Sequence, residues 1–438
     1  MYSKKILLLV TQDHGGAGLA MHKITMLLRS QGHQAVLVVK NKIKSDDYII
    51  EYKFEIPAFL NFWTNLKNKL SRKYHKYLNP KKSVYNNKYD DIYCFYSTDE
   101  KSTNVNPKNF FKQIGFIPEF IFSGWTADFL NSSDVLLLQQ ISKAQVYTIA
   151  IDMNHYTGGC HYGWDCKGYI NGCTDSCPAI LSNDDKNLAK ENFEIKFQNA
   201  KKGGFKIISG SGWTLEQSKV SKIYQNQILF PNINSLIDTS IMKPINKTLA
   251  RAHFGLQEDK FYILMGCQNA NDKRKGFEYL VEALDILREN LNPENNKKVV
   301  VLVVSKNKLT TIEQIKFETK QLDFVDNYAD LAMLYEASDV FVNSSIEDSG
   351  PMMVSESLAC GTPVVAFDMG VANNLVISFF NGYKAKLKDT NDLAAGIKHI
   401  IELQPEIYKN YARNATETIK NQSSFETGIK VFNEILNQ

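Results

Sequence analysis

Short runs of apolar residues recur along the chain and alternate with stretches whose pattern predicts helices. Runs that are apolar at nearly every position are typical of strands buried on both faces of a parallel sheet, and parallel strands need crossover helices between them. In the first half, the predicted strands span residues 6–10, 35–39, 120–122, 147–151 and 205–209, and a helix spans residues 19–31. In the second half, strands at 261–265, 299–304, 340–343 and 363–366 alternate with helices at 277–291, 329–337 and 351–359. The pattern predicts an α/β chain with two Rossmann-like, doubly wound parallel sheets.

The length of 438 residues allows two domains of about 200 residues each. We place the first domain at residues 1–225 and the second at residues 226–420. The last segment, residues 421–438, opens with the spacing of a helix capping box at Ser423 and Glu426. One face of the amphipathic helix that should follow carries the apolar residues Ile429, Phe432, Ile435 and Leu436.

The composition is that of an ordinary globular protein, with 44% hydrophobic and 22% charged residues. The longest apolar runs fall far short of the ~20 residues of a membrane helix. The run at residues 6–10 is shorter than the core of a typical signal peptide, so we expect a cytoplasmic protein. In that compartment the seven cysteines are expected as thiols or metal ligands rather than disulfides. The net charge of +4 gives no reason to expect a nucleic-acid partner.

The stretch from residue 40 to residue 118 is irregular and rich in Asn, Lys and Tyr, which indicates an insertion that carries acceptor specificity or a loosely packed lid. Within it, residues 53–88 interleave basic and aromatic side chains. Such a segment suits an anionic membrane surface or a lipid-phosphate acceptor, and would place the protein peripherally at the inner face of the membrane. A solvated basic helix that covers the first domain explains the same residues equally well.

An acidic turn joins a predicted strand and helix between residues 343 and 367. The first backbone N–H groups of a helix lack partners within the helix, so those around Gly350, Met352 and Met353 could bind phosphate. The carboxylates of Glu347 and Asp348 stand beside that site and could accept hydrogen bonds from sugar hydroxyls, and Glu356 could do so from a ribose. In the alternative reading, the two acids merely favour a helix N-terminus and Glu356 is solvated.

A cationic segment follows the predicted strand at residues 261–265. Lys275 and the neighbouring Arg274 could neutralise a diphosphate leaving group as its bond to a sugar breaks. The alternative is an exposed basic loop. In the first domain, the glycine turn that follows the first strand would let the backbone at Gly16 approach a ligand closely, although such a turn can also be only a tight loop.

Four of the seven cysteines fall in one glycine-rich loop with the spacing C-x5-C-x6-C-x3-C: Cys160, Cys166, Cys173 and Cys177. Four thiolates satisfy tetrahedral zinc and leave no open position, so a metal there would be structural. His161 could replace one thiol, and two disulfides or four free thiols are alternatives. We expect no catalytic metal.

The segment SLACGTPVVAF resembles the signature of the retaining glycosyltransferases of family 4, in which an E-x7-E pattern runs into A-C-G-T-P-V-V. With seven residues between the two acids, the partner of Glu356 is Asp348, whereas Glu347 gives E-x8-E; we favour Glu347 as the longer acid and keep both as candidates. The residues Lys273 to Gly276 resemble the R/K-K-G segment of this family. The cysteine loop is similar to the D-M-x-x-x-T-G-G-C-H-Y segment of a subgroup associated with colanic-acid and exopolysaccharide biosynthesis.

This resemblance implies the two-domain GT-B fold, with a cleft between the domains and a last helix that crosses back to the first domain. It also implies transfer of a sugar from a UDP- or GDP-linked donor to a saccharide or polyprenyl-diphosphate-linked acceptor, with retention of configuration, in surface polysaccharide biosynthesis. Gly16 would face the donor, and Lys275 and Arg274 would grip its diphosphate. Many members have a histidine before the Asp-Met pair, where this chain has Ile151, so Asp152 or His155 would have to substitute.

Two other functions fit parts of the sequence. A GT-B nucleotide-sugar epimerase would use a similar cleft without an acceptor. A zinc-stabilised nucleic-acid-binding protein would use the cysteine loop and the basic aromatic stretch, but the nearly balanced charge argues against it.

Overall fold

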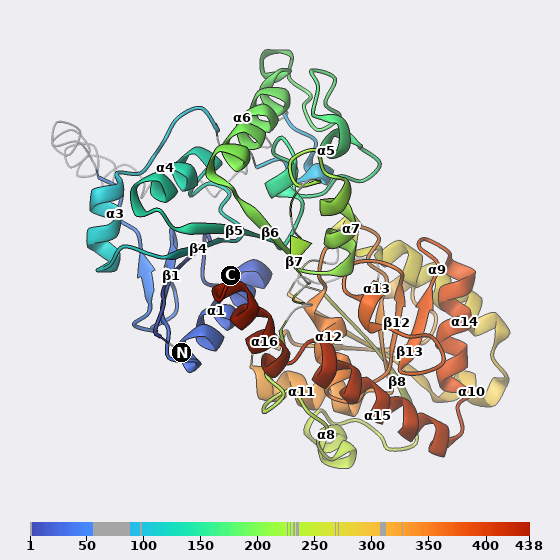
Figure 1. Cartoon of the computed structure of the whole chain (residues 1–438). Coiled ribbons are helices and arrows are strands. Elements are labelled where there is room, and N and C mark those ends of the chain that lie inside the picture. The colour runs from blue at the N-terminus through green and yellow to red at the C-terminus, as the bar shows by residue number, and fades with distance from the viewer. Residues whose placement is uncertain are drawn as a thin grey trace, which may run out of the picture.

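The structure is a computed structural model of the chain. It describes residues 2–55, 88–96, 99–225, 227, 229–230, 233, 236–267, 269, 271–306, 312–325 and 327–438. These residues form two α/β domains, each built on a parallel sheet with helices on both faces (Figure 1). The expectation of two Rossmann-like domains with parallel sheets is confirmed. Most of the basic aromatic stretch, residues 56–87, lies outside the described residues, so its proposed membrane contact stays a prediction.

The first sheet has the strand order β3-β2-β1-β4-β5-β6-β7, with every described pair parallel. Its strands are β1 (Lys5–Leu9), β2 (Gln34–Val39), β3 (Ile49–Glu51), β4 (Phe120–Ser123), β5 (Gln145–Ala150), β6 (Lys206–Ser209) and β7 (Leu229–Phe230). Its helices are α1 (Gly15–Ser30), α3 (Pro107–Ile114), α4 (Ser132–Ser142), α5 (Gly168–Asn171), α6 (Leu188–Gly203) and α7 (Gly212–Val220).

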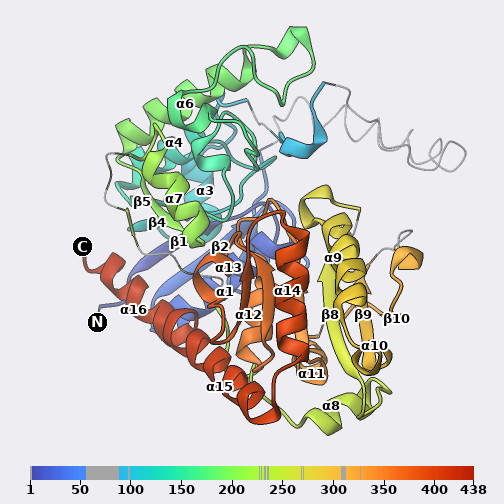
Figure 2. The same cartoon turned by 90° about the vertical axis from the view of Figure 1, so that its right-hand side faces the viewer.

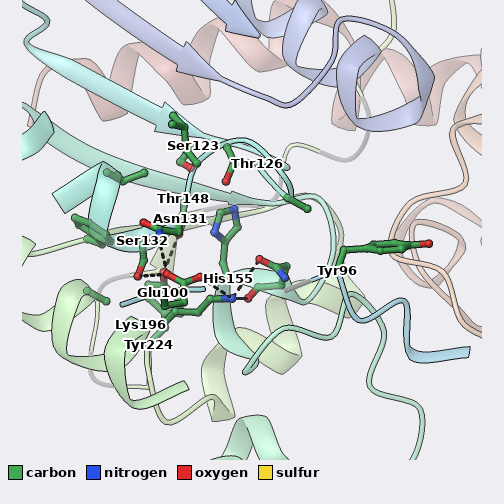
Figure 3. A pocket seen from close by; sticks show the side chains of 16 residues that line it. Tyr96, Glu100, Ser123, Thr126, Asn131, Ser132, Thr148, His155, Lys196 and Tyr224 are labelled. Atoms are coloured by element: carbon green, nitrogen blue, oxygen red, sulfur yellow. Dashed lines mark hydrogen bonds and ion pairs between the residues drawn. The ribbon is translucent and has the colours of Figure 1, made fainter. Parts of the chain in front are cut away.

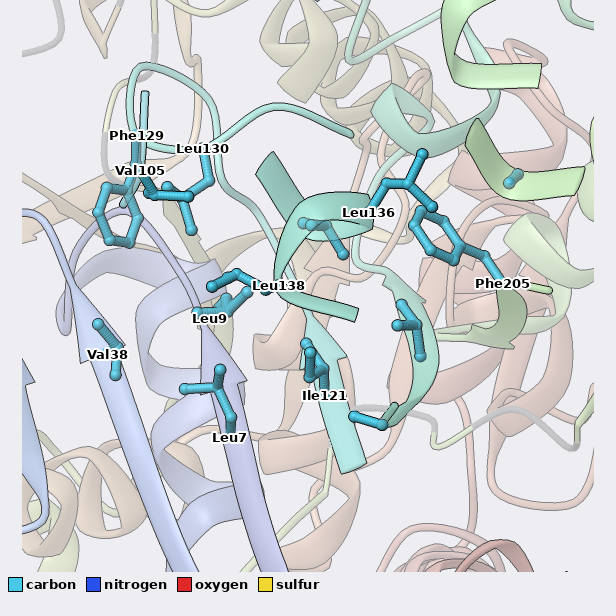
Figure 4. Close-up of a cluster of buried hydrophobic side chains, with 14 of the residues drawn as sticks. Leu7, Leu9, Val38, Val105, Ile121, Phe129, Leu130, Leu136, Leu138 and Phe205 are labelled. Atoms are coloured by element: carbon cyan, nitrogen blue, oxygen red, sulfur yellow. The ribbon is translucent and has the colours of Figure 1, made fainter. Parts of the chain in front are cut away.

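Strand β1 shows why this sheet needs helices on both faces. Successive side chains of a strand point to opposite faces of the sheet. The continuous apolar sequence of β1 must therefore be covered on both faces. Leu7 and Leu9 pack into a cluster with Leu136 and Leu138 of α4 (Figure 4). Residues of α3 and α6 belong to the same cluster. Ile6 and Leu8 pack into a second cluster with residues of α1.

The second sheet has the order β10-β9-β8-β11-β12-β13 and is also parallel. Its strands are β8 (Phe261–Cys267), β9 (Val299–Ser305), β10 (Glu318–Leu322), β11 (Val340–Asn343), β12 (Val364–Phe367) and β13 (Gly382–Ala385). Its helices are α8 (Lys247–His253), α9 (Phe277–Asn290), α10 (Pro293–Lys298), α11 (Tyr328–Ala337), α12 (Met352–Ala359), α13 (Ala372–Leu375), α14 (Thr390–Ile401) and α15 (Pro405–Gln422). Residues of α11, α12 and α15 cover one face, and residues of α9 and α14 cover the other.

The chain passes between the domains twice, and the two crossings pair with each other. Ile237 N–H donates to the carbonyl oxygen of Ser423 over 2.8 Å, and Phe425 N–H donates to that of Ile237 over 3.1 Å. The last helix, α16 (Phe425–Leu436), then packs against α1 and the first sheet, where Phe432 lies 5.6 Å from Phe122 between ring centroids (Figures 1 and 2). The last helix therefore crosses back to the first domain. Strand β7 extends the first sheet to Phe230, beyond the boundary at residue 225 that the sequence suggested.

Within the described part of the chain, none of the helices combines the length and apolar character that a membrane crossing requires.

Candidate active site

The acidic turn and the cationic turn lie at the same point of the second sheet. The acidic turn follows β11 and leads into α12, and the cationic turn Lys273–Lys275 follows the neighbouring strand β8. From β8 the chain continues to β9 on one side, and β11 lies on the other side, so the strand order reverses between β8 and β11. In doubly wound sheets, ligands bind outside the carboxyl ends of the strands at such a reversal.

Direct contacts join the two turns. The backbone N–H of Ile346 donates to the carbonyl oxygen of Arg274 over 2.8 Å, and the Ser344 hydroxyl donates to that of Lys275 over 3.0 Å. The Lys275 ammonium forms an ion pair with the Asp348 carboxylate. The structure therefore brings together the two motifs that the sequence singled out, and neither forms a separate exposed loop.

Asp348 is only 6% exposed, which makes its charge dependent on its neighbours. Burial would raise the pKa of Asp348, but the nearby Lys275 and Arg274 outweigh it and hold that pKa below its usual value. Arg274 also pairs with Asp272, and its guanidinium lies 3.9 Å from the ring centroid of Tyr162, a residue of the first domain. Two cations of the turn, Arg274 and Lys275, are therefore each paired with an acid, and Arg274 also faces an aromatic ring.

Glu347 faces the first domain. Its Oε1 accepts a hydrogen bond of 3.0 Å from the backbone N–H of Trp164. Burial raises the pKa of the Glu347 carboxyl, while the backbone N–H groups of Trp164 and Gly163 oppose this by stabilising the ionised form. Glu347 and Asp348 thus have different surroundings: Asp348 is paired with a cation, and Glu347 is held by main-chain donors.

Glu356 is 4% exposed on α12, so the alternative of a solvated acid is wrong. Its Oε2 accepts a hydrogen bond of 3.0 Å from the Tyr335 hydroxyl. Burial raises the pKa of Glu356, opposed by the charge of Lys23 on α1. The Lys23 ammonium lies 5.0 Å from the ring centroid of Tyr328 on α11, so this buried acid also stands near the contact between the two domains.

At the start of α12, Gly350, Met352 and Met353 are partly exposed. The Gly350 N–H donates to Asp348 Oδ1 over 3.3 Å. One of the N–H groups at the start of this helix is therefore bonded to the acidic turn. The Met353 side chain lies against Gly266 at the end of β8. The predicted phosphate-binding residues are therefore adjacent to the predicted cations.

A small cavity opens beside Lys275, lined by residues at the carboxyl ends of β8 and β11, including Gly266, Asn343 and Ser344. Asn343 Nδ2 is buried there and has no hydrogen-bond partner within the described residues. A buried amide nitrogen without a partner is unfavourable by about 1–3 kcal/mol, so this group is suited to a polar ligand atom.

In the first domain, Gly16 is exposed in the first turn of α1, and a Cβ built there would meet nothing within 4 Å. The space above this glycine is open to a ligand, as its expected role requires.

The two residues expected to replace a histidine before the Asp-Met pair lie in different surroundings. Asp152 Oδ2 is 2.7 Å from His161 Nδ1, and both side chains are buried. His155 instead points into a polar cavity of about 40 Å³ between β4, β5 and α6 (Figure 3). A water molecule needs about 10–15 Å³ by this measure, so the cavity suits a few waters and not a sugar residue. Burial lowers the pKa of His155 to about 4, which leaves its imidazole neutral at pH 7.

The four cysteines of the glycine-rich loop lie near one another, and two of them, Cys166 and Cys173, lie beside α5. Cys160 packs with Cys173 and Cys177, and both Cys166 Sγ and Cys173 Sγ lie near Gly168. Backbone N–H groups donate to the sulfurs: Gly168 to Cys166 over 3.4 Å, and Ala179 and Ile180 to Cys177. Such donors favour thiolates and are typical of metal ligands. Across the described residues, however, no three side chains of His, Cys, Asp or Glu stand close enough together to hold a metal ion.

Tyr162 and Trp164 were not singled out by the sequence, although both lie between Cys160 and Cys166. Their contacts with Arg274 and Glu347 place them at the same site. Two aromatic residues in a glycine-rich loop between cysteines were a signal that could have identified them.

Known proteins resemble this chain in both sequence and fold. Residues 246–418, less than half of the chain, match the family described as glycosyl transferases group 1. D-inositol 3-phosphate glycosyltransferase of Pseudarthrobacter chlorophenolicus is 28% identical over 164 residues, 36% of this chain and 38% of that protein. N,N'-diacetylbacillosaminyl-diphospho-undecaprenol alpha-1,3-N-acetylgalactosaminyltransferase of Campylobacter jejuni is 24% identical over 144 residues, 33% of this chain and 36% of that protein. Each match thus spans well under half of the relative's length.

Solved structures resemble the whole chain. Sucrose-phosphate synthase of Thermosynechococcus elongatus has a TM-score of 0.64 at 15% identity, covering 99% of this chain and 98% of that one. HepE of Anabaena, solved in complex with UDP-glucose, has a TM-score of 0.60 at 16% identity, covering 99% of both chains. The chain therefore has the two-domain GT-B fold, and its second domain matches the group 1 glycosyltransferases, which together support a glycosyltransferase.

Proposed function

We propose that this protein transfers a sugar from a UDP- or GDP-linked donor to a saccharide or polyprenyl-diphosphate-linked acceptor, with retention of configuration. The observation that carries the proposal is the meeting of the cationic turn Lys273–Lys275 with the acidic turn at the strand-order reversal of the second sheet. One turn supplies positive charge for a diphosphate, and the other supplies acceptors for sugar hydroxyls. Retention of the anomeric configuration rests on the resemblance to the glycosyltransferases of family 4.

The leaving diphosphate needs positive charge where its negative charge develops. Lys275 and Arg274 would supply it, exchanging part of their contact with Asp348 and Asp272 for the phosphates. The N–H groups at the start of α12 would add donors at the positive end of the helix dipole. Glu347 and Asp348 would hold the sugar, and Glu356 the ribose.

The acceptor is proposed from a relative's name and from the composition of the first domain. The Campylobacter relative is named for an acceptor in which a diphosphate joins the sugar to undecaprenol. An acceptor of that class, used at the inner face of the membrane in surface polysaccharide biosynthesis, agrees with the basic aromatic stretch at residues 53–88. We also keep the proposal that Cys160, Cys166, Cys173 and Cys177 bind a structural zinc ion, because the sulfurs of Cys166 and Cys177 accept backbone N–H bonds of the kind that metal-bound thiolates receive.

Incubation with each nucleotide sugar and an acceptor mixture, followed by NMR of the product, tests the function. The proposal predicts a new glycosidic bond with the same anomeric configuration as the donor. An isomerised nucleotide sugar formed without acceptor would instead identify an epimerase. The comparisons favour neither the epimerase nor the nucleic-acid-binding alternative.

A further inference from the structure

A loop of the first domain supplies main-chain hydrogen bonds to an acid of the second. The Trp164 N–H donates to Glu347 Oε1 over 3.0 Å, across 183 positions of sequence. The Gly163 N–H donates to Met153 Sδ over 3.1 Å and also helps to stabilise the ionised form of this carboxylate. The loop therefore reaches the carboxylate to which we assign the sugar hydroxyls.

Trp164 is held in an unfavourable backbone conformation at this contact. Its φ is +49°, in the left-handed region, which is unfavourable by about 1–2 kcal/mol for a residue with a side chain. Such a conformation persists only where the surroundings fix it, and it is concentrated at functional sites. Here the indole is anchored at two places: Nε1–H donates to the carbonyl oxygen of Ile92 over 2.8 Å, and the ring packs on the apolar cluster that includes Val340 and Phe367 of the second domain.

Other contacts between the domains surround the acidic turn. The Ser349 hydroxyl donates to the carbonyl oxygen of Ile151, and Gly212 N–H donates to Asn374 Oδ1 over 2.6 Å. Tyr162 lies under Arg274. The environment of Glu347 is thus completed by residues of the first domain.

We propose that Trp164 is a positioning residue of the donor-sugar site: its anchored indole holds the Trp164 N–H against Glu347, so that this carboxylate is oriented and ionised for the sugar hydroxyls. The inference rests on the proposed function and adds a residue to it. One backbone donor occupies only part of the acceptor capacity of a carboxylate, which leaves sites for hydroxyls. The donor-sugar site is therefore built from residues of both domains.

Binding of UDP alone and of UDP-glucose, with GDP and GDP-mannose in parallel, tests this proposal by calorimetry. Trp164→Gly removes the indole while glycine still accepts the left-handed conformation, and Trp164→Phe retains part of the ring packing. We expect Trp164→Gly to weaken nucleotide-sugar binding about tenfold or more but to leave nucleotide binding near the wild-type value, with Trp164→Phe in between. Trp213→Phe, which alters a partly buried indole packed on the core of the first domain, is the matched control and should change neither.

The dependence on pH separates positioning from a merely structural role. Besides the N–H groups of residues 163 and 164, the groups that bear on Glu347 are Arg274, Lys388, Tyr156 and Tyr169, together with the adjacent Asp348. Loss of the donors raises the pKa of Glu347, so the acidic limb of sugar-dependent binding should move to higher pH in Trp164→Gly. In a double-mutant cycle, Trp164→Gly should add little to the loss caused by Glu347→Gln.

The binding results distinguish the positioning role of Trp164 from the proposed function. Equal losses of UDP and UDP-glucose binding in Trp164→Gly, or no loss of either, would overturn the positioning role and leave the proposed function standing. A wild-type protein that binds no nucleotide and no nucleotide sugar would overturn both.

Discussion

Gly276 and Ser344 approach each other so closely that only glycine fits: a Cβ at Gly276 would lie 2.1 Å from the carbonyl oxygen of Ser344. Gly276 also has a φ of +61°, which favours glycine. This contact is what allows the cationic turn after β8 to lie directly against the end of β11.

We predict that Gly276→Ala displaces the cationic turn and lowers nucleotide-sugar affinity at least tenfold. Gly204→Ala is the matched control, because Gly204 has the same φ of +61° but open space around its Cβ position. Both variants should be destabilised by about 1–2 kcal/mol by the left-handed backbone, and only Gly276→Ala should lose donor binding. Calorimetric affinities and melting temperatures of both proteins check this, and comparable affinity losses in the two variants would contradict it.

Lys275→Ala should lower kcat/KM for the donor by about 10²–10³, since loss of one electrostatic donor at a developing charge typically has that effect. Lys273, in the same turn but exposed, is the control, and Lys273→Ala should stay within a fewfold of wild type. Steady-state kinetics with varied donor provide the measurement. Full activity in Lys275→Ala would remove Lys275 from the site.

The metal proposal predicts about one zinc ion per purified chain by elemental analysis, and close to none in Cys166→Ser/Cys173→Ser. Cys94→Ser removes a thiol outside the group and should keep the metal. In metal-free protein, Cys177 should then be more reactive than Cys173: a hydrogen bond with Cys160 lowers the pKa of Cys177 to about 7, whereas burial raises that of Cys173 to about 12.

Because the thiolate is the nucleophile, alkylation of Cys177 by iodoacetamide should accelerate as pH rises through about 7 and level off above it. Peptide mass spectrometry after timed labelling measures this. Four thiols that are equally reactive, in protein purified without zinc, would contradict both the metal and the arrangement of the loop.

The last helix is expected to stabilise the first domain. Phe432 is 1% exposed and packs edge-on against Phe122, so Phe432→Ala should lower stability by about 3–5 kcal/mol. The melting temperature should fall by several degrees, whereas Ile407→Ala, at an exposed position of α15, should leave it nearly unchanged. A melting temperature unaffected by Phe432→Ala would show that α16 contributes little to the fold.

The sequence predicts the centres of both sheets because their strands are apolar at nearly every position, as in β9, whose seven residues are all buried and of which only the last, Ser305, is polar. Edge strands are different. Strand β10 has the polar sequence ETKQL and exposed positions, and β7 has only two residues, so neither carries an apolar run that the sequence reveals. Backbone pairing with a neighbour, and not side-chain burial, makes them strands.

The residues of the candidate site likewise include some that the sequence predicts and some that it does not. Arg274, Lys275, Glu347 and Asp348 were predictable because each belongs to a local motif at the end of a strand, and parallel strands bring their carboxyl ends to one edge. The contact of Trp164 with Glu347 was not, because it depends on how two separately folded domains meet. No spacing along the chain encodes that arrangement.

The most direct test of the central claim, a nucleotide-sugar site at the strand-order reversal of the second domain, is the melting temperature of the wild-type chain with UDP-, GDP- and ADP-sugars. A donor at ~100 times its dissociation constant adds about 2.7 kcal/mol of stability. We predict that at least one nucleotide sugar raises the melting temperature and that Lys275→Ala abolishes this rise. No rise with any of these nucleotide sugars, or an equal rise in Lys275→Ala, would contradict the claim.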